Sequence, residues 1–179
     1  MEKEVHIHDK TFVPFITAPQ LQVRIAELGA LINEDLKDKR PLIVGVLNGS
    51  AIFMADLLRV IQLPCEIAFI RVSSYSGTES TGTVKNVIGL TEDISGRDVI
   101  LVEDIIDTGD TAKYLLDDFK SKNPASVRFA TLLFKPASLR QEIKPDYVGF
   151  EIPPAFVVGY GLDYDGLGRN LADIYQLKS

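Results

Sequence analysis

Short apolar runs that alternate with helical patterns constrain the fold of this chain more than any other feature. Leu42–Leu47 and Val127–Phe134 are compact apolar runs with β-branched residues, which is typical of strands covered on both faces. Elsewhere, apolar side chains recur at helical spacing, over Thr17–Lys37 and again over Ala51–Ile61. Strands that alternate with helices indicate βαβ units, so we expect an α/β fold with a mostly parallel, twisted sheet flanked by helices.

The ends of these elements carry their own signals. Thr17-Ala18-Pro19-Gln20 has the form of a capping box with proline in the first turn, so the first helix should begin there. A third helix should follow Thr111, because the next apolar side chains also recur at helical spacing: Ala112, Leu115, Leu116 and Phe119. Further strands are expected at Glu66–Val72, Val84–Leu90, Val99–Val102, Tyr147–Phe150 and Phe156–Tyr160.

Length, charge and cysteine content exclude several classes of protein. A chain of 179 residues fits one domain over residues 1–179. The net charge of -6 argues against a general nucleic-acid binder, which needs cationic side chains to neutralise phosphates. No apolar stretch approaches the roughly 20 residues of a membrane helix, so no membrane partner is expected. Cys65 is the only cysteine, which excludes an intrachain disulfide and favours a cytoplasmic protein.

An acidic turn follows the predicted strand that ends at Val102. In open parallel sheets, ligands bind beyond the carboxyl ends of the strands, which is where this turn lies. Its carboxylates would repel one another unless a cation or ribose hydroxyls met them, whereas Thr108, Gly109 and Thr111 offer hydroxyls and backbone N–H groups that favour a phosphate. The pattern therefore indicates a sugar phosphate. A simple helix cap would explain the later acids but not Glu103-Asp104.

Val99–Thr111, which reads Val-Ile-Leu-Val-Glu-Asp-Ile-Ile-Asp-Thr-Gly-Asp-Thr, closely resembles the phosphoribosyl pyrophosphate signature of type I phosphoribosyltransferases. Leu47–Ser50 resembles the pyrophosphate loop of the hypoxanthine-guanine branch of that family. Ser74-Tyr75, with Ser80-Thr-Gly82, resembles its mobile lid, which would span residues 73–83. The resemblance implies the sheet described above plus a small hood formed by the terminal segments, with residues 145–179 contributing to a purine-binding hood.

The resemblance implies a role for each residue of the donor side. Glu103 and Asp104 would hold the ribose hydroxyls, directly or through Mg²⁺, a cation that prefers oxygen ligands. Asp107 would lie near N7 of the purine and act as general base. The 5-phosphate would be held by Thr108, Gly109, Asp110 and Thr111, and the pyrophosphate would be contacted by Asn48, Gly49 and Arg169.

The base side is implied by Lys135 and by the run from Lys144 to Tyr164, which also resemble this branch. Lys135 would meet the purine 6-oxo group, because a donor-only cation distinguishes a carbonyl from an amine. Phe156 would stack on the base, Val157 would bond it through the backbone, and Asp163 would bind a second Mg²⁺. The expected activity is magnesium-dependent transfer of a phosphoribosyl group to hypoxanthine or guanine, with xanthine as a further candidate acceptor. The resemblance also implies a homodimer or homotetramer. Without the resemblance, a solvated strand-end lysine is the favoured interpretation of Lys135, whereas core packing and a binding role explain Phe156 equally well.

Two positions depart from the family's usual pattern. Asn48 stands where the pyrophosphate loop commonly carries lysine, so we expect this loop to act mainly through its backbone, with a strained peptide at Leu47-Asn48. Asp110 occupies a phosphate-loop position that is often lysine, asparagine or hydrophobic, so its carboxylate should point away from the phosphate.

Three other functions compete with this one. An enzyme of the same superfamily could act on adenine, orotate or xanthine alone, and a regulator with the same fold could bind nucleotide or RNA without catalysis. Retention of Asp107 and Lys135 argues against the regulator. A dinucleotide-dependent dehydrogenase is disfavoured, because Gly159-Tyr-Gly161 does not continue as G-x-G-x-x-G. His6 and His8 alternate like strand residues in an expected exposed lead-in, and no metal site is expected there.

Overall fold

The main sheet has the mostly parallel arrangement that the sequence predicts. The computed structural model describes residues 4–74 and 84–178, with the backbone alone described at residues 73, 74 and 84–87. The strand order is β5-β4-β3-β6-β7-β8, and only the pairing of β5 with β4 is antiparallel in the described sheet. These strands span Leu42–Leu47 (β3), Glu66–Ser74 (β4), Val84–Ile88 (β5), Asp98–Ile106 (β6), Ser126–Phe134 (β7) and Tyr147–Glu151 (β8).

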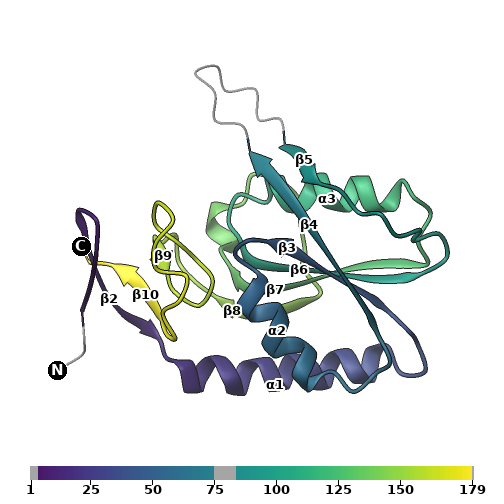
Figure 1. The fold of residues 1–179 in the computed structure, drawn as a ribbon, viewed down its shortest axis with the longest axis horizontal. Coiled ribbons are helices and arrows are strands. Elements are labelled where there is room, and N and C mark those ends of the chain that lie inside the picture. Colours follow the sequence, from purple (N-terminus) through teal and green to yellow (C-terminus); the bar gives the residue numbers. More distant parts are fainter. Residues whose placement is uncertain (1–3, 75–83, 179) are drawn as a thin grey trace.

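Helices cover both faces of this sheet (Figure 1). On one face, α1 (Ala18–Asp35) and α2 (Ala51–Val60) pack on inward side chains such as Ile43 and Ile100. On the other face, α3 (Asp110–Lys120) packs on a second apolar cluster, and a short 3₁₀ turn, η1 (Pro136–Ser138), follows β7. The predicted capping box is present, since the Gln20 side chain accepts a hydrogen bond of 2.9 Å from the Thr17 backbone N–H.

A second sheet forms the hood from the two ends of the chain. Its antiparallel order is β1-β2-β10-β9, made by Val5–Ile7 (β1), Lys10–Ile16 (β2), Ile174–Leu177 (β10) and Val157–Val158 (β9). Figure 1 shows this sheet beside the carboxyl-terminal loops and at the start of α1. The hood of terminal segments is therefore confirmed. The segment before Thr17, expected as an exposed lead-in with strand-like alternation at His6 and His8, is mostly strand.

Several predicted element boundaries were wrong, among them those of β6 and β9. The strand expected to end at Val102 continues to Ile106, because Glu103 still pairs with Thr131 and Ile106 with Phe134 of β7. The strand expected over Phe156–Tyr160 is confined to Val157–Val158. Gly159 and Tyr160 end it by taking positive φ values of 102° and 49°, which are incompatible with an extended strand.

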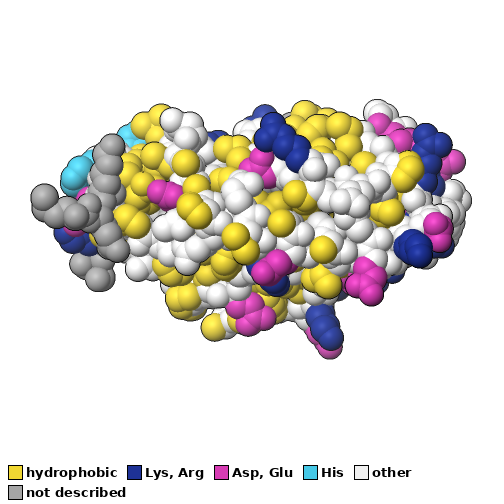
Figure 2. Space-filling view, turned by 90° about the horizontal axis from the view of Figure 1, so that it is seen from below, with side chains coloured by type: hydrophobic (Ala, Val, Ile, Leu, Met, Phe, Trp, Pro, Cys, Tyr) yellow, Lys and Arg dark blue, Asp and Glu magenta, His cyan; other side chains and the backbone are white. Residues whose placement is uncertain are grey.

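The helices, the surface charges and Cys65 can be compared with what composition led us to expect. None of the helices in residues 4–74 and 84–178 has the length and apolar character required to span a membrane. Figure 2 shows acidic and basic side chains interspersed among apolar ones on the face that carries α1 and α2. Cys65 is half-buried beside the α1 and α2 cluster, and burial raises the pKa of its thiol.

Candidate active site

The candidate site lies where the carboxyl ends of β3, β6 and β7 meet the hood. The loop after β3 begins at Asn48, the turn after β6 begins at Asp107, and Lys135 directly follows β7. Parallel strands bring these three segments to one edge of the sheet, as the βαβ pattern predicts. Residues far apart in the sequence are therefore neighbours in the fold.

A small hollow of about 100 Å³ lies at the start of α3. Gly109 precedes the helix with a φ of +84°, a conformation that glycine adopts without steric cost. The backbone N–H groups of the first helical turn are directed at this end of α3, which favours an anion. The hollow is lined by Glu103, Ile105, Ile106, Asp107, Thr108, Gly109, Thr111 and Ala112.

The carboxylate of Asp110 is bonded to two side chains beside that hollow. Gln141 donates to one oxygen at 2.8 Å and the Thr108 hydroxyl donates to the other at 3.0 Å. These two hydrogen bonds, that of Gln141 first, lower the pKa of Asp110 because they stabilise the ionised form. The segment that carries Gln141 is in turn tied to the turn by a backbone bond of 2.9 Å from Arg140 to the Thr108 carbonyl. Nothing in the sequence signalled Gln141.

A larger cavity of about 250 Å³ lies between the main sheet and the hood. Its polar centre is an ion pair, in which Lys135 Nζ lies 2.7 Å from Asp107 Oδ2. Lys135 is only 7% exposed, so the lysine that sequence alone would place in solvent is buried. The structure brings together all four predicted base-side residues here, and the lining is Asp104, Ile105, Asp107, Lys135, Phe156, Val157, Leu162 and Asp163.

Glu103, which is buried, and Asp104, which is half-buried, are neighbours that line different cavities. Glu103 faces the hollow at α3 and Asp104 faces the larger cavity, because successive side chains of a strand point to opposite sides. Burial, and then the charge of Asp104, raise the pKa of Glu103 well above its usual value. Burial raises the pKa of Asp104 to about 6. This value is the balance of several influences: the charge of Asp163 adds to the rise in pKa, whereas a 2.9 Å bond from the Ile105 backbone N–H and the charge of Arg169 oppose it.

The loop after β3 packs tightly against these groups. The Leu47–Asn48 peptide bond, where the sequence predicts an unusual backbone, is cis. A side chain at Gly49 would place its Cβ 1.6 Å from Asp104 Oδ2, so only glycine fits beside that carboxylate. On the other side, a Cβ at Gly161 would lie 2.1 Å from the Gly49 carbonyl oxygen. The loop backbone is therefore held between Asp104 and the hood.

Arg169 holds together the hood loop that carries Gly161 and Asp163. One guanidinium nitrogen donates to the Gly161 carbonyl at 2.7 Å, and another lies 2.7 Å from Asp163 Oδ1. Gly161 thus belongs to a hood loop that packs on the loop after β3. It does not open a helix, as a dinucleotide-binding motif would require.

Two predicted groups need separate mention. Tyr75 lies outside the described residues, as does the side chain of Ser74, so the expected lid has no structural description. Within residues 4–74 and 84–178, no group of three or more His, Cys, Asp or Glu side chains is arranged to hold a metal ion by itself. Asp104 and Asp163 nevertheless line one cavity, where oxygen atoms of a ligand could complete a coordination shell.

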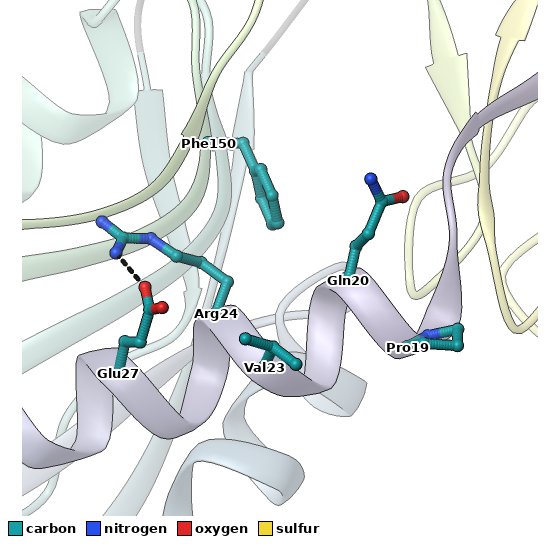
Figure 3. A pocket seen from close by; sticks show the side chains of 6 residues that line it. All are labelled: Pro19, Gln20, Val23, Arg24, Glu27 and Phe150. Atoms are coloured by element: carbon teal, nitrogen blue, oxygen red, sulfur yellow. Dashed lines mark hydrogen bonds and ion pairs between the residues drawn. The ribbon is translucent and has the colours of Figure 1, made fainter.

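A hollow of about 390 Å³ along α1 carries none of the predicted site residues (Figure 3). It is lined by Pro19, Gln20, Val23, Arg24, Glu27 and Phe150. Arg24 spans it, with an ion pair of 2.5 Å to Glu27 and hydrogen bonds of 2.8 Å to the carbonyls of Val148 and Gly149. These bonds attach α1 to β8, so this hollow belongs to the packing between the two elements.

Sequence reasoning missed several residues around the larger cavity. Ile105 and Leu162 contribute apolar walls, and Tyr164 contacts the ring of Phe156. Leu162 and Tyr164 flank Asp163 in the run that resembles the purine-binding end, so their position was a signal for a role near the base.

Comparison with known proteins gives one consistent family. Residues 16–165 match the family model of the phosphoribosyl transferase domain. A hypoxanthine-guanine phosphoribosyltransferase of Bacillus subtilis is 45% identical over 164 residues, which is 91% of this chain and 91% of that protein. A hypoxanthine phosphoribosyltransferase structure from Staphylococcus aureus superposes with a TM-score of 0.88 at 43% identity, covering 92% of this chain and 90% of that one. A Trypanosoma cruzi hypoxanthine phosphoribosyl transferase gives a TM-score of 0.89 at 36% identity, covering 97% and 95%.

Proposed function

This chain belongs to the phosphoribosyl transferase family, and we propose that it is a purine salvage enzyme. It transfers the phosphoribosyl group of 5-phosphoribosyl 1-pyrophosphate to hypoxanthine or guanine and releases IMP or GMP with pyrophosphate. The relatives named as hypoxanthine-guanine phosphoribosyltransferases support the substrate class. The site supports it independently through the chemistry of its two cavities.

The ion pair between the buried Lys135 and the half-exposed Asp107 is the observation that carries this proposal. A buried ammonium can only donate, so a ligand in the cavity is favoured if it presents an acceptor such as a 6-oxo group. The 6-amino group of adenine would instead place donor against donor. A base that takes the hydrogen bond of Lys135 frees Asp107 to accept a proton from the purine ring, in the role of general base.

The walls of the cavity support a flat, partly apolar ligand. Phe156 is 44% exposed at the edge of the hood, which leaves a ring face available for stacking on a base. Leu162 and Ile105 line the same cavity. We propose that the base lies on Phe156 and bonds to the backbone at Val157.

The hollow at α3 would take the 5-phosphate of the donor. Thr108, Gly109 and Thr111 supply hydroxyl and backbone donors there, at the positive end of the helix dipole. We propose that phosphate binding draws the Thr108 hydroxyl away from Asp110, to which it donates in this structure. Asn48, Gly49 and Arg169 would contact the pyrophosphate, with Asn48 acting mainly through its backbone.

The donor set at Asp104 and Asp163 fits Mg²⁺. Both groups are carboxylates on one cavity, and burial disfavours the charge of Asp104, so a hard cation would stabilise its ionised form. Glu103 lies on the other side of the strand and would act on the ribose or through its charge. When bound, Mg²⁺ supplies positive charge beside the departing pyrophosphate. The chain's own residues orient the donor. Gly49 has no side chain, so the donor can approach the backbone of this loop closely, and the ion pair with Arg169 holds the Asp163 carboxylate in place.

Further parts of the proposal concern the chain as a whole. We propose a single domain over residues 1–179, with residues 73–83 as the lid and residues 145–179 contributing to the purine-binding hood. Ile67 and Phe69 are 53% and 41% exposed on β4, which supports burial in a homodimer or homotetramer. A cytoplasmic location agrees with the single, unpaired Cys65.

A base panel tests the proposal. Protein, Mg²⁺ and phosphoribosyl pyrophosphate are mixed with hypoxanthine, guanine, xanthine, orotate or adenine, and pyrophosphate release is measured. We expect release with hypoxanthine and guanine and none with adenine. Release with adenine or orotate alone would contradict the assignment of the base, and release with no base at all would contradict phosphoribosyl transfer.

A further inference from the structure

Phe156 rests on two other aromatic rings. The Tyr164 ring meets it edge to face at 86°, with 5.6 Å between centroids, and the Phe12 ring lies 6.0 Å away. Phe12 is fully buried, whereas Phe156 remains half-exposed at the cavity. The ring that would stack on the base therefore packs on Phe12 and Tyr164, and its edge-to-face contact is with Tyr164.

Tyr164 is in turn held by the turn between β1 and β2. Its hydroxyl donates to Asp9 Oδ1 at 2.7 Å, across 155 positions of sequence. The His8 ring lies 5.6 Å from the Tyr164 ring at 76°, and Lys10 Nζ lies 5.4 Å from its centroid. Lys10 also lies 3.4 Å from the second oxygen of Asp9. The three residues of this turn thus surround one aromatic side chain.

The backbone of Tyr164 is fixed as well. Its N–H donates to the Leu167 carbonyl at 2.8 Å, and the Leu167 N–H donates back at 3.1 Å. Asp163, the preceding residue, accepts a bond of 2.8 Å from the Gly166 N–H. A tight loop therefore joins the proposed metal-binding carboxylate to the support of the stacking ring.

We infer that Tyr164 and Asp9 are positioning residues for the purine base, acting through the ring of Phe156. This inference rests on the proposed function. A half-exposed ring that is free to rotate loses rotamer entropy when a base stacks on it, and that loss weakens base binding. The hydroxyl bond to Asp9 fixes Tyr164, and Tyr164 fixes Phe156 before the base arrives. The amino-terminal turn is thereby part of the base site.

Loss of this positioning should weaken binding of the purine base and leave binding of the phosphoribosyl donor unchanged. Tyr164→Phe and Asp9→Ala each remove the same hydrogen bond, and we expect each to raise the KM for hypoxanthine by about two- to fivefold. In the double variant, the KM for hypoxanthine should rise no more than in the more affected single variant, because both substitutions remove the same hydrogen bond. Tyr164→Leu also removes the ring edge, so we expect an increase of about three- to tenfold. The KM for phosphoribosyl pyrophosphate should stay unchanged in all four variants, since Tyr164 does not line the hollow at α3 that would bind the 5-phosphate.

Tyr175→Phe is the matched control. Tyr175 lies in the same hood sheet, and its hydroxyl is 3.5 Å from Asp173, so this variant makes the same chemical change away from Phe156. It should leave both KM values unchanged. Thermal unfolding of each variant separates loss of the fold from loss of positioning.

The decisive readout is steady-state kinetics of the full-length protein with each substrate varied in turn. A rise in the base KM alone, absent from the control and not additive in the double variant, supports the inference. An active wild type whose Tyr164 and Asp9 variants change neither KM, or change both equally, overturns this inference alone. A wild type that transfers to neither hypoxanthine nor guanine overturns the proposed function as well.

Discussion

Replacing Asp104 by asparagine should stabilise the folded protein while it removes a proposed metal and ribose ligand. The carboxyl group of Asp104 is half-buried beside Glu103, and its partial removal from water raises its pKa from 3.8 to about 6. A carboxyl group whose pKa is raised by folding binds its proton more tightly in the folded state. The ionised form therefore destabilises the fold, to a small extent below pH 4 and fully above about pH 6.

The size of this effect follows from the pKa difference. At about 1.4 kcal/mol per pKa unit, the penalty at pH 8 is about 3 kcal/mol. Asparagine has nearly the same shape and can still accept the bond from the Ile105 N–H, so most of the penalty should be recovered. At pH 4.5 the advantage should fall to about 1 kcal/mol, because the wild-type group is then largely protonated in the folded state. For a chain of this size, a gain of 2 to 3 kcal/mol at pH 8 corresponds to a rise in Tm of roughly 4–12 °C.

Urea unfolding at pH 8 and pH 4.5, in EDTA to remove divalent cations, measures the stability gain of Asp104→Asn over wild type at each pH. Asp146→Asn is the matched control, since that carboxylate also accepts a backbone bond, of 2.8 Å from the Phe129 N–H, and lies outside the pair. The reasoning is refuted if Asp104→Asn is less stable than wild type at pH 8, or if its advantage is equal at both pH values. Added Mg²⁺ should stabilise the wild type more than the variant, because it neutralises a charge that only the wild type carries.

Three further substitutions test other parts of the site. Asp107→Asn should lower turnover by about 10²- to 10⁴-fold, and an unaltered rate would remove Asp107 from proton transfer. Gly49→Ala should lower the free energy of unfolding by about 1–3 kcal/mol and raise the KM for the donor, because its Cβ would collide with Asp104; donor kinetics equal to wild type would count against this contact. Lys135→Met should raise the KM for hypoxanthine by about tenfold or more, whereas an unchanged base KM would show that the lysine does not contact the purine.

The regular elements could be predicted from sequence because they depend on local patterns. The apolar run Leu42–Leu47 and the capping box at Thr17 specify β3 and the start of α1 without reference to distant residues. The edge of the sheet that carries the site follows from parallel strand order, so Asp107 and Lys135 could be expected close together. The family signature then suggested which chemistry these groups serve.

The remaining features depend on contacts between distant segments. The pairing of β2 with β10 joins the two ends of the chain, and no local pattern encodes it. The extension of β6 past Val102 depends on the partner strand β7. Pairing with β7 continues although the next two residues of β6 are acidic. The bond from Tyr164 to Asp9 likewise exists only once the hood has formed. Such contacts decide how the site is supported, and sequence alone did not show them.

The most direct test of the proposed activity is a competition for one limiting donor. Wild-type protein receives phosphoribosyl pyrophosphate, Mg²⁺ and equal concentrations of hypoxanthine, guanine and adenine, and the nucleotides are separated by chromatography. We predict that IMP and GMP form, that AMP does not, and that the nucleotides formed equal the donor consumed. AMP as the main product, or consumption of the donor without any nucleotide, would contradict the account of Lys135 and Asp107.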